Sequence, residues 1–173
     1  INGDYEVSNE NGLAHAINNL MKGGGNFYLT AAKYDMTGIN VNSLVIEAGK
    51  TLNIYGETPV VTRSATTVAG VTIKGLDGAF LPKVDKGSKV TVSGVTLEGD
   101  GTTVLVGENN GTVIVYETTA DTLVKKGNDP VAASEVSTIG ELTAALDAGA
   151  EEIKLVADIE AEKVIEISKS VVI

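Results

Sequence analysis

The spacing of apolar residues along the first part of the chain predicts a helix followed by strands. Between Asn9 and Met21 the apolar side chains fall at the i, i+3, i+4, i+7 and i+8 positions of one helix face: Leu13, Ala16, Ile17, Leu20 and Met21. Ser8 or Asn9 is placed to cap the N-terminus of this helix, and the run Gly23 to Gly25 is expected to end it. The pattern is typical of a short amphipathic helix.

From Phe27 onward apolar and polar residues alternate in short β-branched runs that end at Gly, Asn or Asp. This period of two predicts strands at Phe27–Ala31, Val41–Ile46, Thr51–Ile54, Val71–Ile73, Val90–Val92, Val95–Leu97, Val104–Val106 and Val113–Val115. Because alternate side chains of a strand face opposite sides, the inward rows are expected to be Leu44, Ile46, Leu52, Ile54, Val71, Ile73, Val90, Val92, Val95, Leu97, Val104, Val106, Val113 and Val115. The pattern lapses from Leu81 to Lys86 and from Thr118 to Ala133, where no strand is expected.

The opening of the chain recurs near its end. A shift of 129 positions places the run Glu6 to Ile17 on the run Glu135 to Leu146 without a gap. The recurrence predicts a second helix that begins after Ser137 or Thr138 and stops at Gly149, followed by strands at Ile153–Ala157, Val164–Ile167 and Val171–Ile173. We therefore expect residues 1–133 to form one module with a helical cap, and residues 134–173 to form the beginning of a second, similar module.

Glycines precede several of the predicted strands at a bounded interval. Gly49, Gly70, Gly87 and Gly111 are separated by 21, 17 and 24 positions. Such a period indicates the coils of a solenoid, because one coil of short strands cannot bury its inward face until a neighbour stacks on it. The helix before the first coil would then cover the open apolar end of the stack.

The pattern from Val7-Ser8 through Phe27-Tyr28-Leu29 to Gly49-Lys50-Thr51-Leu52-Asn53-Ile54 resembles the entry into right-handed parallel β-helices of the pectin-lyase-like superfamily, particularly those of bacterial surface and secreted proteins. The second copy, from Val136-Ser137 to Asp158-Ile159, is similar to the same entry. The resemblance covers residues 6–116 and 135–173 and concerns the fold more than the activity. A β-sandwich, which also uses many short strands, is the alternative architecture.

Composition narrows the classes of partner and compartment. The 173 residues carry a net charge of −10, and the clustered Lys and Arg that bind nucleic acid are missing. No apolar run approaches the ~18 residues of a membrane-spanning helix. The chain has no cysteine and is rich in Gly, which together with its acidity is common outside bacterial cells. It starts at Ile1 without a visible signal peptide, as expected of a processed or trimmed protein.

Residues that could carry catalysis are few. The resemblance implies either a calcium-binding aspartate cluster with a catalytic arginine or closely paired aspartates. The chain has a single arginine, Arg63, and a single histidine, His15, and lacks an Asp-Asp pair. No catalytic residue of the family is therefore carried over, and we expect a protein that is not an enzyme, with no assigned catalytic, cofactor or metal residue.

Weaker candidates for binding lie in the glycine-rich turns. Glu98–Gly101 and Glu108–Gly111 place carboxylates and amides among glycines, as calcium loops do, without the Asp-x-Asp-x-Asp-Gly spacing. Asn110–Thr112 fits an N-glycosylation acceptor. A threonine-rich face for glycans or ice would use Thr62, Thr66, Thr67, Thr72, Thr91, Thr96, Thr102 and Thr103, although threonine on an outward strand face also follows from β-propensity alone.

Our leading hypothesis is a non-enzymatic, extracellular structural or adhesive module of a bacterial surface protein. The alternatives are a carbohydrate-active β-helix, either lyase-like or glycan-binding, and a subunit of a head-to-tail filament. Glycans or other surface proteins are the expected partners, and residues 134–173 are the expected contact of any homo-oligomer. This segment of ~40 residues has too little core to fold alone, so its own module, further polypeptide or another molecule would have to cover it.

Overall fold

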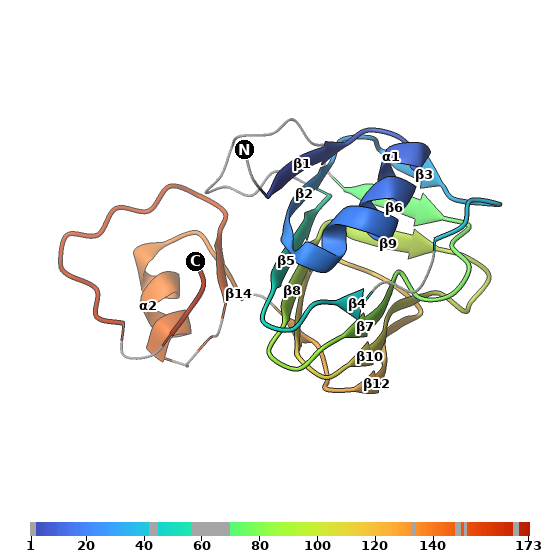
Figure 1. Ribbon diagram of the computed structural model, residues 1–173. Coiled ribbons are helices and arrows are strands. Elements are labelled where there is room, and N and C mark those ends of the chain that lie inside the picture. Colours follow the sequence, from blue (N-terminus) through green and yellow to red (C-terminus); the bar gives the residue numbers. More distant parts are fainter. Residues whose placement is uncertain are drawn as a thin grey trace. The chain divides into compact units, whose positions relative to one another are not determined.

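The computed structural model describes residues 3–41, 45–56, 70–132, 134–147, 150, 152–167 and 170–173 (Figure 1). The chain divides into two compact units: the described residues up to Val131 belong to the first and those from Ala132 onward to the second. The predicted boundary after residue 133 lies two residues beyond this division.

The strands of the first unit form three parallel sheets. The first sheet has the order β1 (Asp4–Val7), β2 (Gly25–Leu29), β5 (Thr51–Tyr55), β8 (Lys89–Ser93), β11 (Thr112–Tyr116) and β13 (Val131–Ala132). The second has β3 (Lys33–Asp35), β6 (Val71–Lys74) and β9 (Val95–Glu98). The third has β4 (Val45–Ile46), β7 (Leu81–Val84), β10 (Val104–Asn109) and β12 (Thr122–Gly127).

The chain visits the three sheets in a fixed order. It passes from β2 to β3 to β4, then from β5 to β6 to β7, and then from β8 to β9 to β10, so that each strand pairs with its counterpart one circuit later (Figure 1). The strand pairs of the described residues are parallel, for example Leu52 opposite Val90 and Val90 opposite Val113. The protein is thus mostly β with parallel sheets. The alternative β-sandwich does not agree with this pairing, because its strands are antiparallel.

The predicted first helix is present, but it has three forms. The α-helix α1 spans Glu10–His15 and continues as a π-helical turn at 16–20 and a 3-10 turn at 21–23. Asn9, not Ser8, is the N-cap, since its Oδ1 accepts a hydrogen bond from the Gly12 amide at 2.8 Å. The side-chain amide of Asn19 donates to the His15 carbonyl at 3.3 Å and so competes for the acceptor that a continuing α-helix would use.

Most of the predicted inward rows are buried in a single apolar core. Leu44 lies outside the described residues, and Val104 and Val115 are only half-buried. Val115 lies in β11, which has β8 on one side and only the two-residue β13 on the other. The side facing β13 is therefore covered less completely. Leu105, at the corner where the chain enters the third sheet, is buried in place of Val104.

The two predicted lapses are wrong, because each contains a strand. β7 includes Pro82, which has no amide hydrogen to donate. The proline does not prevent pairing with β4, because β4 pairs only with Lys83 and Val84 of β7. β12 is the outer strand of the third sheet, so Lys125 and Lys126 are exposed and mask the alternation, while Leu123 and Val124 pack against the core. Both strands pair in register with β10.

The second unit is smaller. It contains β14 (Ser134–Val136), α2 (Ile139–Asp147) and β15 (Ile153–Leu155), with β14 parallel to β15. The strand expected at Val164–Ile167 is wrong, and the one expected at Val171–Ile173 is reduced to a single parallel bridge at Val172. Among the described residues from Ser134 onward, the only strands are β14 and β15, which are too few to complete a ladder here. Gly149, the expected stop of α2, lies outside the described residues.

Candidate functional site

The second unit repeats the strand register of the first. In both units the strand before the helix pairs in parallel with the strand after it. Val7 lies opposite Leu29 in the first unit, and Val136 lies opposite Leu155 in the second. The amide that follows donates to the valine carbonyl in each case, at 3.0 Å in the first unit and 2.9 Å in the second. The recurrence predicted at 129 positions is therefore a recurrence of backbone structure.

A second recurrence lies near residue 173 and was missed in the sequence. Val45-Ile46-Glu47 returns 119 positions later as Val164-Ile165-Glu166, and Leu52–Ile54 then corresponds to Val171–Ile173. The identical Val-Ile-Glu triplet was a signal that could have revealed it.

The bridge in the second unit supports this alignment. In the first unit Asn26 of β2 lies opposite Asn53 of β5. Their equivalents are Glu152 and Val172, and these two residues form the parallel bridge, with the Ile153 amide donating to the Val172 carbonyl at 2.6 Å. Residues 171–173 thus take the place beside β15 that β5 takes beside β2.

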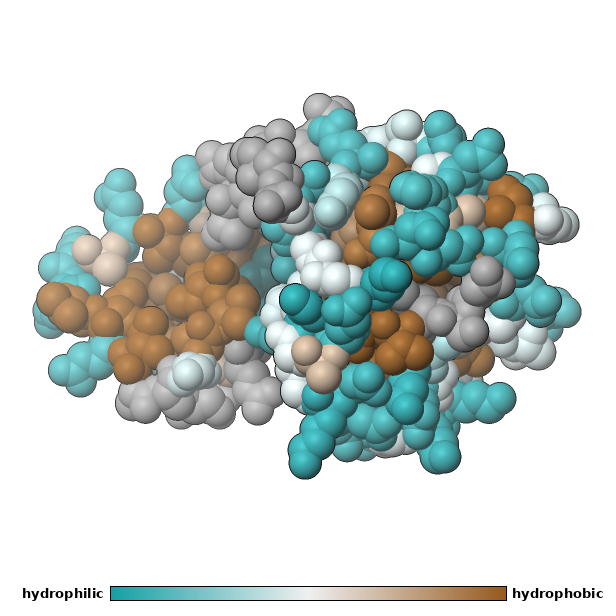
Figure 2. All heavy atoms as spheres, in the orientation of Figure 1, coloured by the Kyte–Doolittle hydropathy of each residue, from teal (hydrophilic) through white to brown (hydrophobic). Residues whose placement is uncertain are grey.

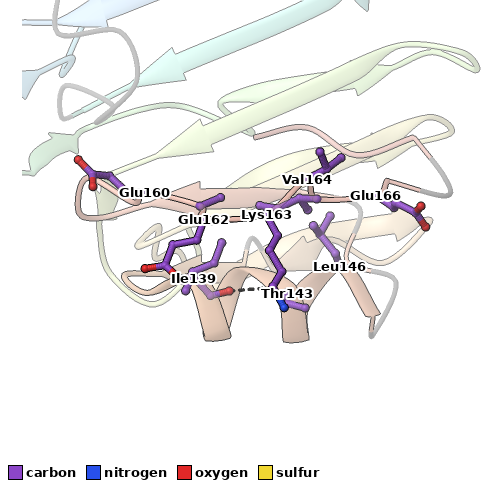
Figure 3. Close-up of a pocket in the computed structure, with 10 residues that line it drawn as sticks. Ile139, Thr143, Leu146, Glu160, Glu162, Lys163, Val164 and Glu166 are labelled. Carbon is purple, nitrogen blue, oxygen red and sulfur yellow. Dashed lines mark hydrogen bonds between the residues drawn. The ribbon is translucent and has the colours of Figure 1, made fainter.

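The connection from Leu155 to Val164 in the second unit is seven residues shorter than the connection from Leu29 to Val45 in the first. The offset between equivalent residues falls from 126 at Leu155 to 119 at Val164. In the first unit the longer connection carries β3, and Tyr34 and Met36 from this connection are fully buried. In the second unit a groove of about 600 Å³ lies between α2 and residues 160–166 (Figure 3).

Two apolar side chains and one threonine from α2 line one wall of the groove, and a charged segment lines the other. Ile139, Thr143 and Leu146 come from α2 (Figure 3). The opposite segment has Glu160 and Glu166 at its two ends, and also contributes Glu162, Lys163 and Val164. The groove therefore places a mainly apolar surface opposite a charged one.

Exposed apolar residues gather on the second unit (Figure 2). Val164 is 92% exposed and Ile167 is 53% exposed. Ile173 is 42% exposed, whereas its equivalent in the first unit, Ile54, is completely buried. Six of the seven exposed large apolar residues of the described chain belong to this unit: Ile139, Val156, Val164, Ile167, Val172 and Ile173. We define the docking edge as residues 164–167 and 171–173.

The outward faces of the first unit carry stacked polar rows that satisfy one another. Asn53 Nδ2 donates to Asn26 Oδ1 at 2.8 Å, and Asn26 Nδ2 donates to Asp4 Oδ1 at 2.8 Å. On the third sheet Glu108 lies between Lys83 and Lys126, 4.0 and 3.8 Å from their Nζ atoms. These rows tie successive strands together and leave their groups engaged with one another.

Several ionisable groups of the first unit have shifted pKa values with structural causes. Burial raises the pKa of the Tyr34 hydroxyl, which donates to the Val7 carbonyl. Hydrogen bonds from the side chain and the amide of Thr103 lower the pKa of Asp121. The Asp35 amide lowers the pKa of Glu10. Each of these hydrogen bonds joins two separate segments of the first unit.

The candidates for calcium and glycan binding have the following places. Asp100 accepts a hydrogen bond from the Thr102 hydroxyl at 2.9 Å. Asp100 also lines a polar hollow of about 420 Å³ together with Asp77 and Glu98. Asn109 is buried, and its Oδ1 accepts from the Gly111 amide at 3.0 Å. Among the described residues, no three His, Cys, Asp or Glu side chains are grouped as a metal ion would require.

The threonines and the remaining single residues are dispersed. Thr72, Thr96 and Thr119 form one outward row on the second sheet. Thr91 is buried, and Thr62, Thr66 and Thr67 lie outside the described residues, as does Arg63. His15 is exposed, with a ring nitrogen 3.2 Å from Asn19 Nδ2.

The described part of the chain contains no helix with the length and hydropathy needed to cross a membrane. Comparison of the chain with protein-family models, with curated proteins and with solved structures finds no match.

Proposed function

We propose that this chain is a non-enzymatic structural or adhesive module of a bacterial surface protein, built as a right-handed parallel β-helix with a helical cap. The observation that carries the proposal is the repeated circuit through three parallel sheets, together with the recurrence of its opening at β14, α2 and β15. A stack of coils that begins again after one module suits a spacer or a ligand-presenting stalk. The outward rows support this role, because they consist of polar groups that pair with one another.

The test is incubation with pectic, alginate and host glycans, with and without calcium, followed by measurement of reducing ends and unsaturated products. We expect no turnover in any sample. Turnover at an ordinary enzyme rate, above about 1 per second, would refute the non-enzymatic role.

The alternative of glycan binding is favoured by one feature, the polar hollow beside the second sheet. Its lining residues include Thr37, Thr102, Thr103, Asp77 and Asp100. Glycan binding there predicts that Asp77→Ala with Asp100→Ala abolishes binding on a glycan array. Glu135→Ala with Asp158→Ala, in the second unit, is the matched control and should leave binding unchanged.

The filament alternative concerns association through residues 134–173. A head-to-tail contact would propagate unless it closed on itself. Its test is removal of residues 134–173 followed by light scattering.

A further inference from the structure

Among the described residues, the docking edge of the second unit lacks the second neighbouring strand that its equivalent in the first unit possesses. In the first unit β4 pairs with β7 and β5 pairs with β8, in parallel. This pairing leaves Ile46, Leu52 and Ile54 completely buried. In the second unit, the equivalent of Ile46 is Ile165, which is only half-buried. The equivalent of Ile54 is Ile173, which is exposed.

The neighbour that β4 and β5 have in the first unit has a definite form. In the first unit, β7 and β8 belong to one continuous segment, Leu81–Ser93, and a short turn joins them. β7 pairs in parallel with β4, and β8 pairs in parallel with β5. The turn is fastened to the preceding circuit, since Ser88 Oγ donates to the Glu47 carbonyl at 2.8 Å and the Lys89 amide donates to the Lys50 carbonyl at 3.0 Å. Glu166 is the equivalent of Glu47 in the second unit, so its backbone carbonyl is the corresponding acceptor.

Charge supports the same form of neighbour. The segment Leu81–Ser93 contains three lysines, Lys83, Lys86 and Lys89, against one aspartate, Asp85. The segment 160–166, which lines one wall of the groove, contains Glu160, Glu162 and Glu166 against one lysine. A basic strand–turn–strand segment is therefore complementary in charge to residues 160–166, beside which its first strand would lie.

We propose that the docking edge binds a parallel strand–turn–strand segment with the chemistry of Leu81–Ser93: inward apolar residues in both strands and lysines in and around the turn. Its first strand pairs with residues 164–166 and its second with 171–173. This inference rests on the modular part of the proposed function, in which residues 134–173 begin a second stack, and does not depend on adhesion or on location.

The experiment places a second copy of residues 55–133 directly after Ile173 of the full chain and measures amide hydrogen exchange. We expect exchange of peptides covering 164–173 to slow on the order of 100-fold relative to the unextended chain, as local opening becomes costly. Peptides covering 51–55 serve as the internal standard of a folded first unit. The matched control carries Val90→Lys and Val92→Lys in the appended copy only, and should give no slowing.

Three results would overturn the proposal. The first is unchanged exchange at 164–173 in the extended chain while the first unit stays protected. The second is equal slowing in the lysine control, since the protection would then not come from inward packing. The third is protection of 164–173 in the unextended chain together with a dimer in light scattering, which would make a second copy the occupant.

If the extended chain precipitates, a synthetic peptide of residues 79–94 replaces it. Added to the full chain, the peptide should shift the NMR resonances of residues 134–173 and leave those of 4–131 unchanged. The peptide with Val90→Lys and Val92→Lys should shift neither set, and equal shifts with both peptides would refute the proposal. Glycan turnover, which would refute the proposed function, does not enter any of these outcomes.

Discussion

At the scale of single residues, the neighbours of a side chain decide what it contributes to stability. Ile54 and Ile173 occupy equivalent positions in the two units, but the first is completely buried and the second is 42% exposed. The stacked circuits on both sides of β5 account for the difference, since β5 lies between β2 and β8. The same residue type should therefore have a large effect in one unit and a small one in the other.

Ile54→Ala is expected to lower the free energy of unfolding by about 2–5 kcal/mol, because it leaves a cavity in a packed row. Ile173→Ala should change it by no more than about 0.5–1 kcal/mol. Urea denaturation followed by far-UV circular dichroism measures both. Equal effects of the two substitutions would contradict the burial difference.

Asp121 predicts a dependence of stability on pH. Its carboxylate accepts hydrogen bonds from the Thr103 amide at 2.9 Å and from the Thr103 hydroxyl at 2.7 Å, which lowers its pKa in the folded protein. A lowered pKa contributes stability that is present above the ordinary aspartate value, about 3.9, and is lost as the pH falls through the lower folded value.

Asp121→Asn should therefore lower the melting temperature at pH 7 and reduce its fall between pH 5 and pH 2. Asp129→Asn, on the turn after β12, is the matched control. Thermal melts at pH 7, 5, 4, 3 and 2 give the comparison. An unchanged slope in the Asp121 variant would show that its hydrogen bonds do not persist in solution.

At the scale of elements, close stacking of circuits places strict demands on some turns. A Cβ added at Gly111 would lie 2.4 Å from the Ser88 carbonyl oxygen and 2.5 Å from that of Asp85. Gly23, which ends the first helical segment, has nothing within 4 Å of such an atom. Neither glycine has the positive φ that would strain any substitution.

Gly111→Ala should destabilise the first unit by about 1–3 kcal/mol, because backbone atoms of the previous circuit must shift. Gly23→Ala should stay within about 0.5 kcal/mol of the parent. Chemical denaturation of the two variants tests this directly. If Gly111→Ala were as stable as Gly23→Ala, the circuits could not be stacked as closely as described.

The helical segment after Asn9 is expected to act as a cap. Leu13, Ile17 and Met21 are at most 1% exposed and belong to the core of the first unit. Leu13→Asp with Ile17→Asp should cause aggregation or lower the melting temperature by more than 10 °C, since several kcal/mol are lost from a domain of this size.

Asn11→Asp with His15→Asp, on exposed positions of the same helix, is the control for added negative charge. A soluble Leu13 and Ile17 double variant with an unchanged melt would show that the helix does not cover the core.

At the scale of the whole molecule, the two units differ in how much core they have. The second unit buries three apolar residues among those described, Val136, Leu142 and Ile153. The first buries most of its inward rows in one cluster. Small cores give marginal stability, so the second unit should unfold first.

A chain that ends at Ala133 should keep the higher of two thermal transitions and lose the lower one. Light scattering on the same samples tests association through residues 134–173. Filaments or large oligomers that vanish on truncation would support assembly, whereas monomers in both samples would exclude it. A single unchanged transition after truncation would show that the second unit is not separately folded in the full chain.

The sequence alone was sufficient to predict the elements in which the spacing of apolar residues matches the buried face. Side-chain periodicity predicts the apolar face of α1 and the alternation in β5, β6 and β8. The matching residue types of the two runs predict the 129-residue recurrence. It failed where neighbours decide the structure. Pro82 and the lysines of β12 hide two strands that exist because β10 supplies a backbone ladder.

The tertiary structure also decided the candidate site. Val164 and Val45 share the same Val-Ile-Glu sequence, but only Val45 lies in a strand, because β7 pairs with it. Alternation specifies which face of a segment is apolar, and it does so from local sequence. Whether that face is covered depends on a strand supplied from elsewhere, and a strand's own residues carry no record of that partner.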